Sequence, residues 1–172
     1  MRYVVTPHRR RRQYEMFMEA MRTVLTLPIK QEINRQMELK RKLDELNSYS
    51  GKLSRIAKNI QNGLIMLNTL RDTENAMTHI LNQCRTMERI IDRSMELTEE
   101  LATEGITLEY MESKYSALKM LRKNILPKLT SLIPLFRPEK KGYMDELTST
   151  VEDMMKWVYA AETGLLPEIE EA

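Results

Sequence analysis

Apolar residues recur at steps of three and four along most of this 172-residue chain, and few residues interrupt them. Steps of that size place side chains on one face of an α-helix, whereas a half-buried β-strand alternates every second residue. The sequence contains only five Gly and six Pro, and a sandwich or barrel of short strands requires far more turn residues. The pattern therefore predicts an all-α protein of about five helices, arranged as an elongated hairpin or bundle.

An extended arm is predicted over residues 1–7, because three β-branched residues precede a proline there. A first helix is expected over residues 8–25 and a second over residues 26–46, with Thr26 as the N-cap and Pro28 in the first turn. The apolar stripe of the first helix consists of Tyr14, Phe17, Met18, Met21 and Leu25, and that of the second consists of Ile29, Ile33, Met37, Leu39, Leu43 and Leu46.

A single long helix is predicted over residues 52–103, because its apolar positions mostly keep the alternating steps of a coiled coil. A helix of about fifty residues would span about 75 Å, which exceeds the core of a compact domain. We therefore expect a kink at Gly63 or in the polar stretch 72–75. The candidate helix-packing seam along it consists of Ile56, Ile60, Leu67, Leu70, Met77, Ile80, Cys84, Met87 and Ile91.

The C-terminal third is predicted to hold two more helices. One begins after Thr107 as its cap and is kinked or ended by Pro127. The last covers residues 143–163 and ends before Gly164. Its part of the packing seam keeps heptad spacing and consists of Leu147, Val151, Met154 and Val158. We expect one helical domain over residues 8–166, followed by an acidic tail over residues 167–172.

Residues that commonly carry catalysis or bind metals are sparse and scattered. His79 and Cys84 are five positions apart, which places them on different sides of a helix. Cys84 lies in the packing seam without a basic group on its own face, which favours an inert buried thiol. The sequence contains no glycine-rich phosphate-binding motif. We therefore expect no enzymatic activity, no cofactor and no metal site.

Charge is distributed unevenly along the chain. Residues 1–60 hold 14 Lys/Arg and 6 Asp/Glu, a balance of +8, whereas residues 61–172 hold 13 and 19, a balance of −6. The most concentrated basic run is Arg9, Arg10, Arg11 and Arg12. Four guanidinium groups bind phosphates well, and they also bind acidic protein surfaces. This run is therefore a candidate contact for an anionic partner, either protein or nucleic acid.

Cellular location is constrained mainly by cysteine and by hydropathy. Cys84 is the only cysteine, so the chain can form no internal disulfide, and secretion through a disulfide-forming route is not expected. No apolar run has the length that crossing a bilayer requires. We expect a cytoplasmic protein or a component of a virus particle, without membrane association. An Arg-rich start without acids before Glu15 is also compatible with an organellar transit peptide.

Long amphipathic helices require partners, which points to a structural role. The favoured prediction is a scaffold, adaptor or connector subunit of a large particle, such as a phage or virus particle, with other protein subunits as partners and a homo-oligomeric state. The alternative is a nucleic-acid-associated accessory subunit that uses the basic N-terminal half. The 14 methionines suit either a plain helical core or an adaptable partner-binding surface.

Overall fold

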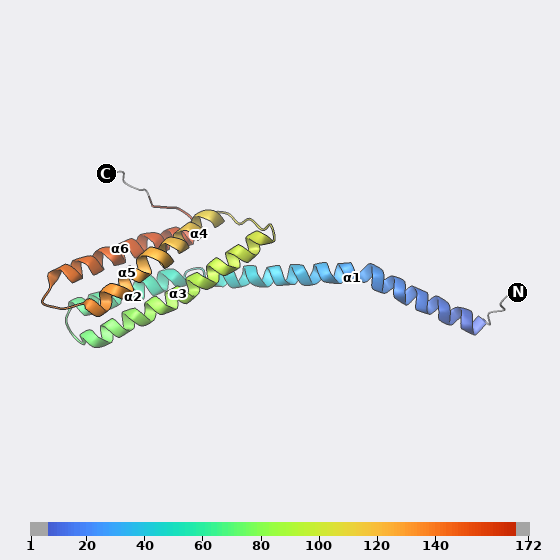
Figure 1. Ribbon diagram of the computed structural model, residues 1–172, viewed down its shortest axis with the longest axis horizontal. Coiled ribbons are helices and arrows are strands. Elements are labelled where there is room, and N and C mark those ends of the chain that lie inside the picture. Colours follow the sequence, from blue (N-terminus) through green and yellow to red (C-terminus); the bar gives the residue numbers. More distant parts are fainter. Residues whose placement is uncertain (1–6, 168–172) are drawn as a thin grey trace. The chain divides into compact units, whose positions relative to one another are not determined.

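A computed structural model describes residues 7–167 of the chain, and the side chains of residues 10–167. The protein is 85% helical and the described residues contain no strand, which confirms the all-α prediction. Figure 1 shows the order of the helices. They are α1 (Pro7–Ser48), α2 (Lys52–Asn68), α3 (Thr73–Thr103), α4 (Met111–Met120), the π-helical turn η1 (Leu121–Ile125), α5 (Leu126–Leu132), the 3-10 turn η2 (Ile133–Leu135) and α6 (Lys141–Thr163).

The number of helices differs from the prediction. The described part of the chain has four helices rather than five, if α1 and α2, which a short turn separates, are counted as one joined stretch of 59 helical residues. The run from α4 to η2 is likewise continuous, and α3 and α6 complete the set. The longest helical stretch therefore lies near the N-terminus and not at residues 52–103.

The chain divides into two compact units, residues 1–42 and residues 43–172, which we call unit 1 and unit 2. The sequence placed one domain over residues 8–166. The arm predicted over residues 1–7 and the acidic tail predicted over residues 167–172 lie almost wholly outside the described residues.

Unit 1 consists of the first and larger part of α1. The predicted break before Pro28 is wrong, because the helix continues through this proline. A proline inside a helix removes one backbone hydrogen bond and bends the helix, but favourable residues on both sides can carry it onward. Thr26 does not act as an N-cap. Its hydroxyl instead donates to the Arg22 carbonyl at 2.5 Å, a bond within one continuous helix.

Unit 2 begins with a helical hairpin in place of the predicted long helix. α2 ends at Asn68, and Leu70 and Asp72 in the following turn have left-handed backbones with φ of 58° and 50°. α3 then returns along α2, so residues 52–103 form two helices, and the break borders the polar stretch 72–75, one of the two places where a kink was expected. Gly63 is no kink. A Cβ atom there would lie 2.6 Å from Cγ1 of Ile80, so glycine permits the close approach of α3.

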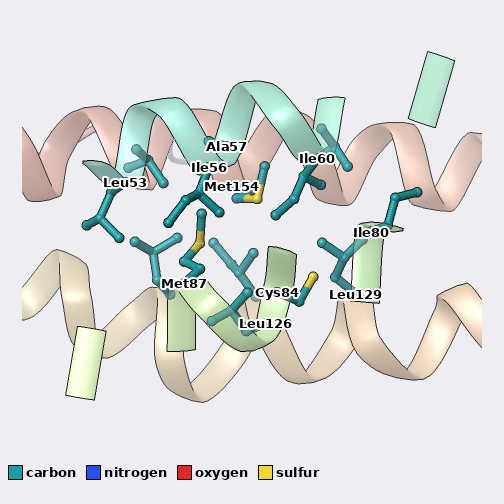
Figure 2. Close-up of a cluster of buried hydrophobic side chains, with 14 of the residues drawn as sticks. Leu53, Ile56, Ala57, Ile60, Ile80, Cys84, Met87, Leu126, Leu129 and Met154 are labelled. Atoms are coloured by element: carbon teal, nitrogen blue, oxygen red, sulfur yellow. The ribbon is translucent and has the colours of Figure 1, made fainter. Parts of the chain in front are cut away.

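The core of unit 2 lies between α2, α3, α6 and the continuous run from α4 to η2. Figure 2 shows Ile60 of α2, Ile80 of α3, Leu129 of α5 and Met154 of α6 converging on one cluster. All four side chains are fully buried. Burying apolar side chains is the main stabilising contribution to such a bundle, at about 1.5–3 kcal/mol for each large side chain.

Of the two outcomes expected at Pro127, a kink or an end, the end is wrong, because α5 continues through it, and a π-helical turn precedes the proline. The Leu126 N–H donates to the Leu121 carbonyl, five residues earlier, so the backbone widens immediately before the proline. Pro127 then occupies the first turn of α5, where a missing N–H costs little. α6 begins two residues before its predicted start and ends at Thr163, where Gly164 with φ of 77° terminates it as expected.

Candidate functional site

The described side chains of α1 in unit 1 are mostly exposed, although Leu39 is buried. Every residue from 10 to 38 is exposed. Apolar side chains that share one face of the helix make up what we call the α1 stripe, which consists of Tyr14, Phe17, Met18, Met21, Leu25 and Ile29. Phe17 is 60% exposed and Leu25 is 62% exposed. Single exposed apolar residues are normal on protein surfaces, but a contiguous set on one helix face is typical of an interaction site.

The same helix carries strong positive charge. Unit 1 holds 11 Lys/Arg and 4 Asp/Glu, a balance of +7. Its first turn contains no acid. Arg10, Arg11 and Arg12 are exposed, whereas the side chain of Arg9 lies outside the described residues. Arg11 approaches Glu15 at 3.7 Å, a highly exposed pair. Cations near a helix N-terminus oppose the helix dipole, so a bound anionic surface would stabilise this arrangement.

A second candidate site is an open groove of about 570 Å³ in unit 2, between the end of α3 and the start of α4. Its lining is mostly apolar and aromatic, and we call it the α3–α4 groove. The apolar lining residues are Ala102, Leu108, Tyr110, Met111 and Tyr115, and the acidic ones are Glu99 and Glu112. A pocket of this size and composition lies in the range that takes up a ligand or several side chains of a partner.

One wall of the groove is fixed by an unusual backbone contact. Tyr110 has φ of 58°, a left-handed backbone conformation that residues other than glycine adopt at a cost in free energy. It packs against Gly164 at the end of α6, where a Cβ atom would lie 2.2 Å from the Tyr110 Cβ. Only glycine fits there, so α6 holds Tyr110 in place. The Tyr110 side chain remains 51% exposed and faces the groove.

The electrostatic surroundings of the groove are acidic. Residues 94–113 contain six Glu and no Lys or Arg. The Tyr115 hydroxyl donates a hydrogen bond to the Glu99 carboxylate, and this bond raises the pKa of Tyr115, with a smaller contribution from burial. Tyr115 is therefore a neutral donor across the ordinary pH range. The groove combines apolar walls with excess negative charge, the opposite of the charge on unit 1.

Two further side-chain contacts hold the elements of unit 2 together. Arg93 of α3 binds the Glu45 carboxylate near the end of α1 at 2.5 Å and 3.0 Å, and these hydrogen bonds raise the pKa of the guanidinium. Ser54 donates to Glu162 from its backbone N–H at 3.1 Å and from its hydroxyl at 2.5 Å. The carboxylate of α6 thereby caps the first turn of α2, which lacks an acid of its own.

The π-helical turn is tied to α3 by charge. Arg122 donates to Asp92 at 2.8 Å and to Glu88 at 3.0 Å, and the hydrogen bond to Asp92 is the main cause that raises its pKa. These acids lie on α3 and the arginine on η1, so the contact fixes the unusual turn against its neighbour. The arrangement is structural, because the paired side chains satisfy one another.

The predicted packing seam lies largely inside unit 2. Most of its members are buried, and Met77 is partly buried against the core. The buried members are Ile56, Ile60, Leu67, Ile80, Cys84, Met87, Ile91, Leu147, Val151, Met154 and Val158. Leu70 differs from the prediction, since the left-handed turn leaves its side chain 54% exposed. The seam therefore meets helices of the same chain and is not available to a partner.

Groups with reactive potential are buried or isolated. Cys84 is 1% exposed, and burial, together with the nearby Glu88 carboxylate, raises the pKa of its thiol to about 12. A thiol of that pKa is a poor nucleophile at neutral pH. His79 is exposed on α3. Across residues 7–167, no group of three or more His, Cys, Asp or Glu is placed to hold a metal ion.

None of the described helices combines the length and the apolar composition that spanning a bilayer requires.

Comparisons with known proteins return no match, since no family model, curated protein sequence or solved structure is significantly similar to this chain.

Sequence reasoning identified the Arg9–Arg12 run as a candidate site. It found the apolar residues of the α1 stripe only as the packing faces of two separate helices, and it missed the α3–α4 groove. The groove depends on a loop that brings Tyr110 beside Gly164, which are 54 positions apart, and no local pattern reports such a contact. One available signal was the absence of Lys and Arg over residues 94–113, the section that later proves to surround the groove.

Proposed function

We propose that this chain is a non-enzymatic structural subunit, a scaffold, adaptor or connector in a larger protein particle such as a phage or virus particle. The observation that carries the proposal is the exposed α1 stripe. Unit 2 buries its own seam and accounts for most of the stable core, whereas unit 1 presents large apolar side chains to solvent. An isolated helix gains most of its stability in proteins from packing its apolar face, so this helix is built to pack against a partner.

The test is the mass of the purified chain by light scattering coupled to chromatography. We expect a discrete oligomer at micromolar concentration and physiological salt. A variant that removes apolar contacts from the stripe, Phe17→Ser with Met21→Ser and Leu25→Ser, is expected to be monomeric with unchanged thermal unfolding of unit 2. A wild-type chain that remains monomeric over the whole concentration range would refute self-assembly.

A nucleic-acid-associated role is the second candidate, and the exposed arginines in the first turns of α1 favour it. Four phosphate contacts would give a log–log dependence of affinity on salt with a slope of about −3.6. Replacing Arg9, Arg10, Arg11 and Arg12 with Gln would then abolish that slope without changing the oligomer. Titration of labelled duplex DNA at three salt concentrations separates the two roles, because the structural role predicts weak binding for both proteins.

A further inference from the structure

We propose that the α1 stripe of one copy docks into the α3–α4 groove of a second copy, so that the chain assembles head to tail. This inference rests on the proposed structural function and names its partner as another copy of the same chain. It follows from three observations, namely complementary charge along the sequence, complementary apolar surface, and a groove whose wall is held in place before any partner arrives.

Charge complementarity is the first observation. Unit 1 has a balance of +7, counted over residues 1–42. The groove is lined by two acids, Glu99 and Glu112, and by no Lys or Arg. Such pairing accelerates association and selects the partner and its register. Pairing α1 with a second α1 would instead join two surfaces of +7 each. The distribution of charge therefore favours α1 against the groove over α1 against itself.

The apolar surfaces also match in kind. The groove offers Leu108, Met111 and two tyrosines as walls, and the α1 stripe offers Phe17, Met21 and Leu25 as exposed side chains. An amphipathic helix that lays its apolar face into an apolar groove is a recurring mode of recognition, with anchors at steps of three and four. Methionine and tyrosine on both surfaces adapt to one another at low cost.

The groove is preformed. Tyr110 is held against Gly164, and Tyr115 is held by its hydrogen bond to Glu99. Binding of a partner helix therefore loses little conformational entropy in ordering this wall, which favours affinity. Because the two surfaces differ, a copy that uses its α1 stripe in one contact still has its groove available for a further copy. A heterologous interface of this type builds rings if the rotation closes and filaments if it does not.

The experiment is a complementation assay by light scattering with two variants, each defective on one surface. The first is the α1-stripe variant Phe17→Ser, Met21→Ser and Leu25→Ser. The second is a groove variant, Ala102→Arg with Glu112→Arg, at two exposed positions. A matched control, Ser131→Arg with Glu139→Arg, makes the same charge change at exposed positions outside the groove. Circular dichroism and thermal unfolding establish that all three fold as the parent does.

Each defective variant alone is expected to be monomeric, with association weakened by about 100-fold or more, as for loss of a central anchor cluster. An equimolar mixture of the two is expected to form a dimer and nothing larger, because one intact α1 and one intact groove remain. The control is expected to assemble as the parent does. Raising the salt concentration is expected to weaken assembly of the parent.

Several results would overturn the inference. A groove variant that assembles as the parent does would mean that α1 binds elsewhere, and the proposed structural function would stand without this interface. A mixture that remains monomeric would exclude docking between copies, and so would a parent that is monomeric at every concentration, which would also refute self-assembly as the function. Stronger association of the parent with anionic phosphatidylserine vesicles than with itself would identify a membrane surface as the partner.

Discussion

α1 and α6 carry similar apolar stripes, but they differ in what covers them. In α6, Leu147 and Met154 are fully buried against the other helices of unit 2. In α1, Phe17 and Leu25 are about as exposed as surface residues usually are. The same apolar periodicity predicts both helices. It identifies the face of a helix that packs against something, but it does not show whether the same chain or another molecule covers that face.

The two helices also differ in charge. Residues 144–163 of α6 contain five acids and Lys156 as the sole base, whereas unit 1 has a balance of +7. The bundle therefore presents acidic sections of chain, and α1 presents a basic one. A helix that is both apolar and oppositely charged to the folded unit is well suited to bind another copy of that unit.

The largest expected difference between a buried and an exposed position concerns a thiol. Burial raises the pKa of Cys84 from about 9 to about 12, which lowers the thiolate population at pH 8 by about 1,000-fold. A disulfide reagent should therefore modify Cys84 in the folded chain more slowly than in denaturant, by at least that factor. A cysteine substituted at Met21, in a Cys84→Ala background and at monomeric dilution, should react as an unfolded thiol does. Rapid labelling of Cys84 in the folded chain would contradict the packing of unit 2.

The same thiol makes a pH-dependent contribution to stability. The raised pKa means that the folded state retains a proton that the unfolded state loses, so the contribution is present below about pH 9 and declines as pH rises toward 12. Comparing the pH dependence of unfolding in the parent and in Cys84→Ala isolates this part from the titration of lysines and tyrosines.

A matched pair of methionine substitutions should give the next largest effect. Met154→Asp places a charge in a fully buried site and should destabilise unit 2 by about 2–4 kcal/mol in denaturant unfolding. Met21→Asp on the α1 stripe should leave unfolding of unit 2 unchanged and reduce the oligomer mass. If Met154→Asp unfolds as the parent does, the seam of α6 faces water.

A pair of glycine substitutions tests how tightly unit 2 is packed. In Gly63→Ala the new methyl group meets Ile80, which is fully buried. The cost of overpacking exceeds the gain in helix propensity, so we expect a net loss of about 1–2 kcal/mol. Gly142→Ala adds a methyl group in open space within α6 and should be neutral or stabilising by up to about 1 kcal/mol. Equal effects at both sites would show that α2 and α3 are more loosely packed.

The smallest expected effect concerns two glutamates. Glu162→Ala removes the carboxylate that caps the first turn of α2 and should cost about 1 kcal/mol, as other lost caps do. Glu15→Ala removes the exposed partner of Arg11 and should change the free energy of unfolding by less than about 0.5 kcal/mol. Thermal unfolding of both variants beside the parent measures the difference.

The sequence predicts the fold class well and the connections poorly. Few glycines and prolines, together with regular apolar steps, suffice for the all-α architecture, and α6 is predicted to within two residues. The long helix over residues 52–103 is interrupted beside the polar stretch 72–75, where a kink was expected. The full reversal of the chain was not predicted, because it depends on a left-handed turn at Leu70 and Asp72, residues that seldom signal one. At Pro28 and Pro127 the error is the reverse, since a helix end was expected there and is absent. A helix with favourable neighbouring residues continues through a proline or widens before it.

The features of the candidate sites also divide into those that the sequence predicts and those that it does not. The basic run and the α1 stripe are local patterns, so the sequence reveals them. The groove is a tertiary feature that requires the α3–α4 loop to pack on the end of α6, and its aromatic wall is strained against local preference. Features of this kind emerge only once distant segments have been brought together.

The contact between Tyr110 and Gly164 also has a consequence for the order of events during synthesis. The ribosome makes Tyr110 54 residues before Gly164, a delay of several seconds at about 5–20 residues per second. The α1 helix of a nascent chain is complete well before that chain possesses a finished groove. If the α1 stripe docks into the groove as proposed, a copy still on the ribosome would be able to insert its helix into a completed neighbour but not to receive one. Translation itself would then impose a direction on growth, and chains truncated before α6 would end an assembly instead of extending it.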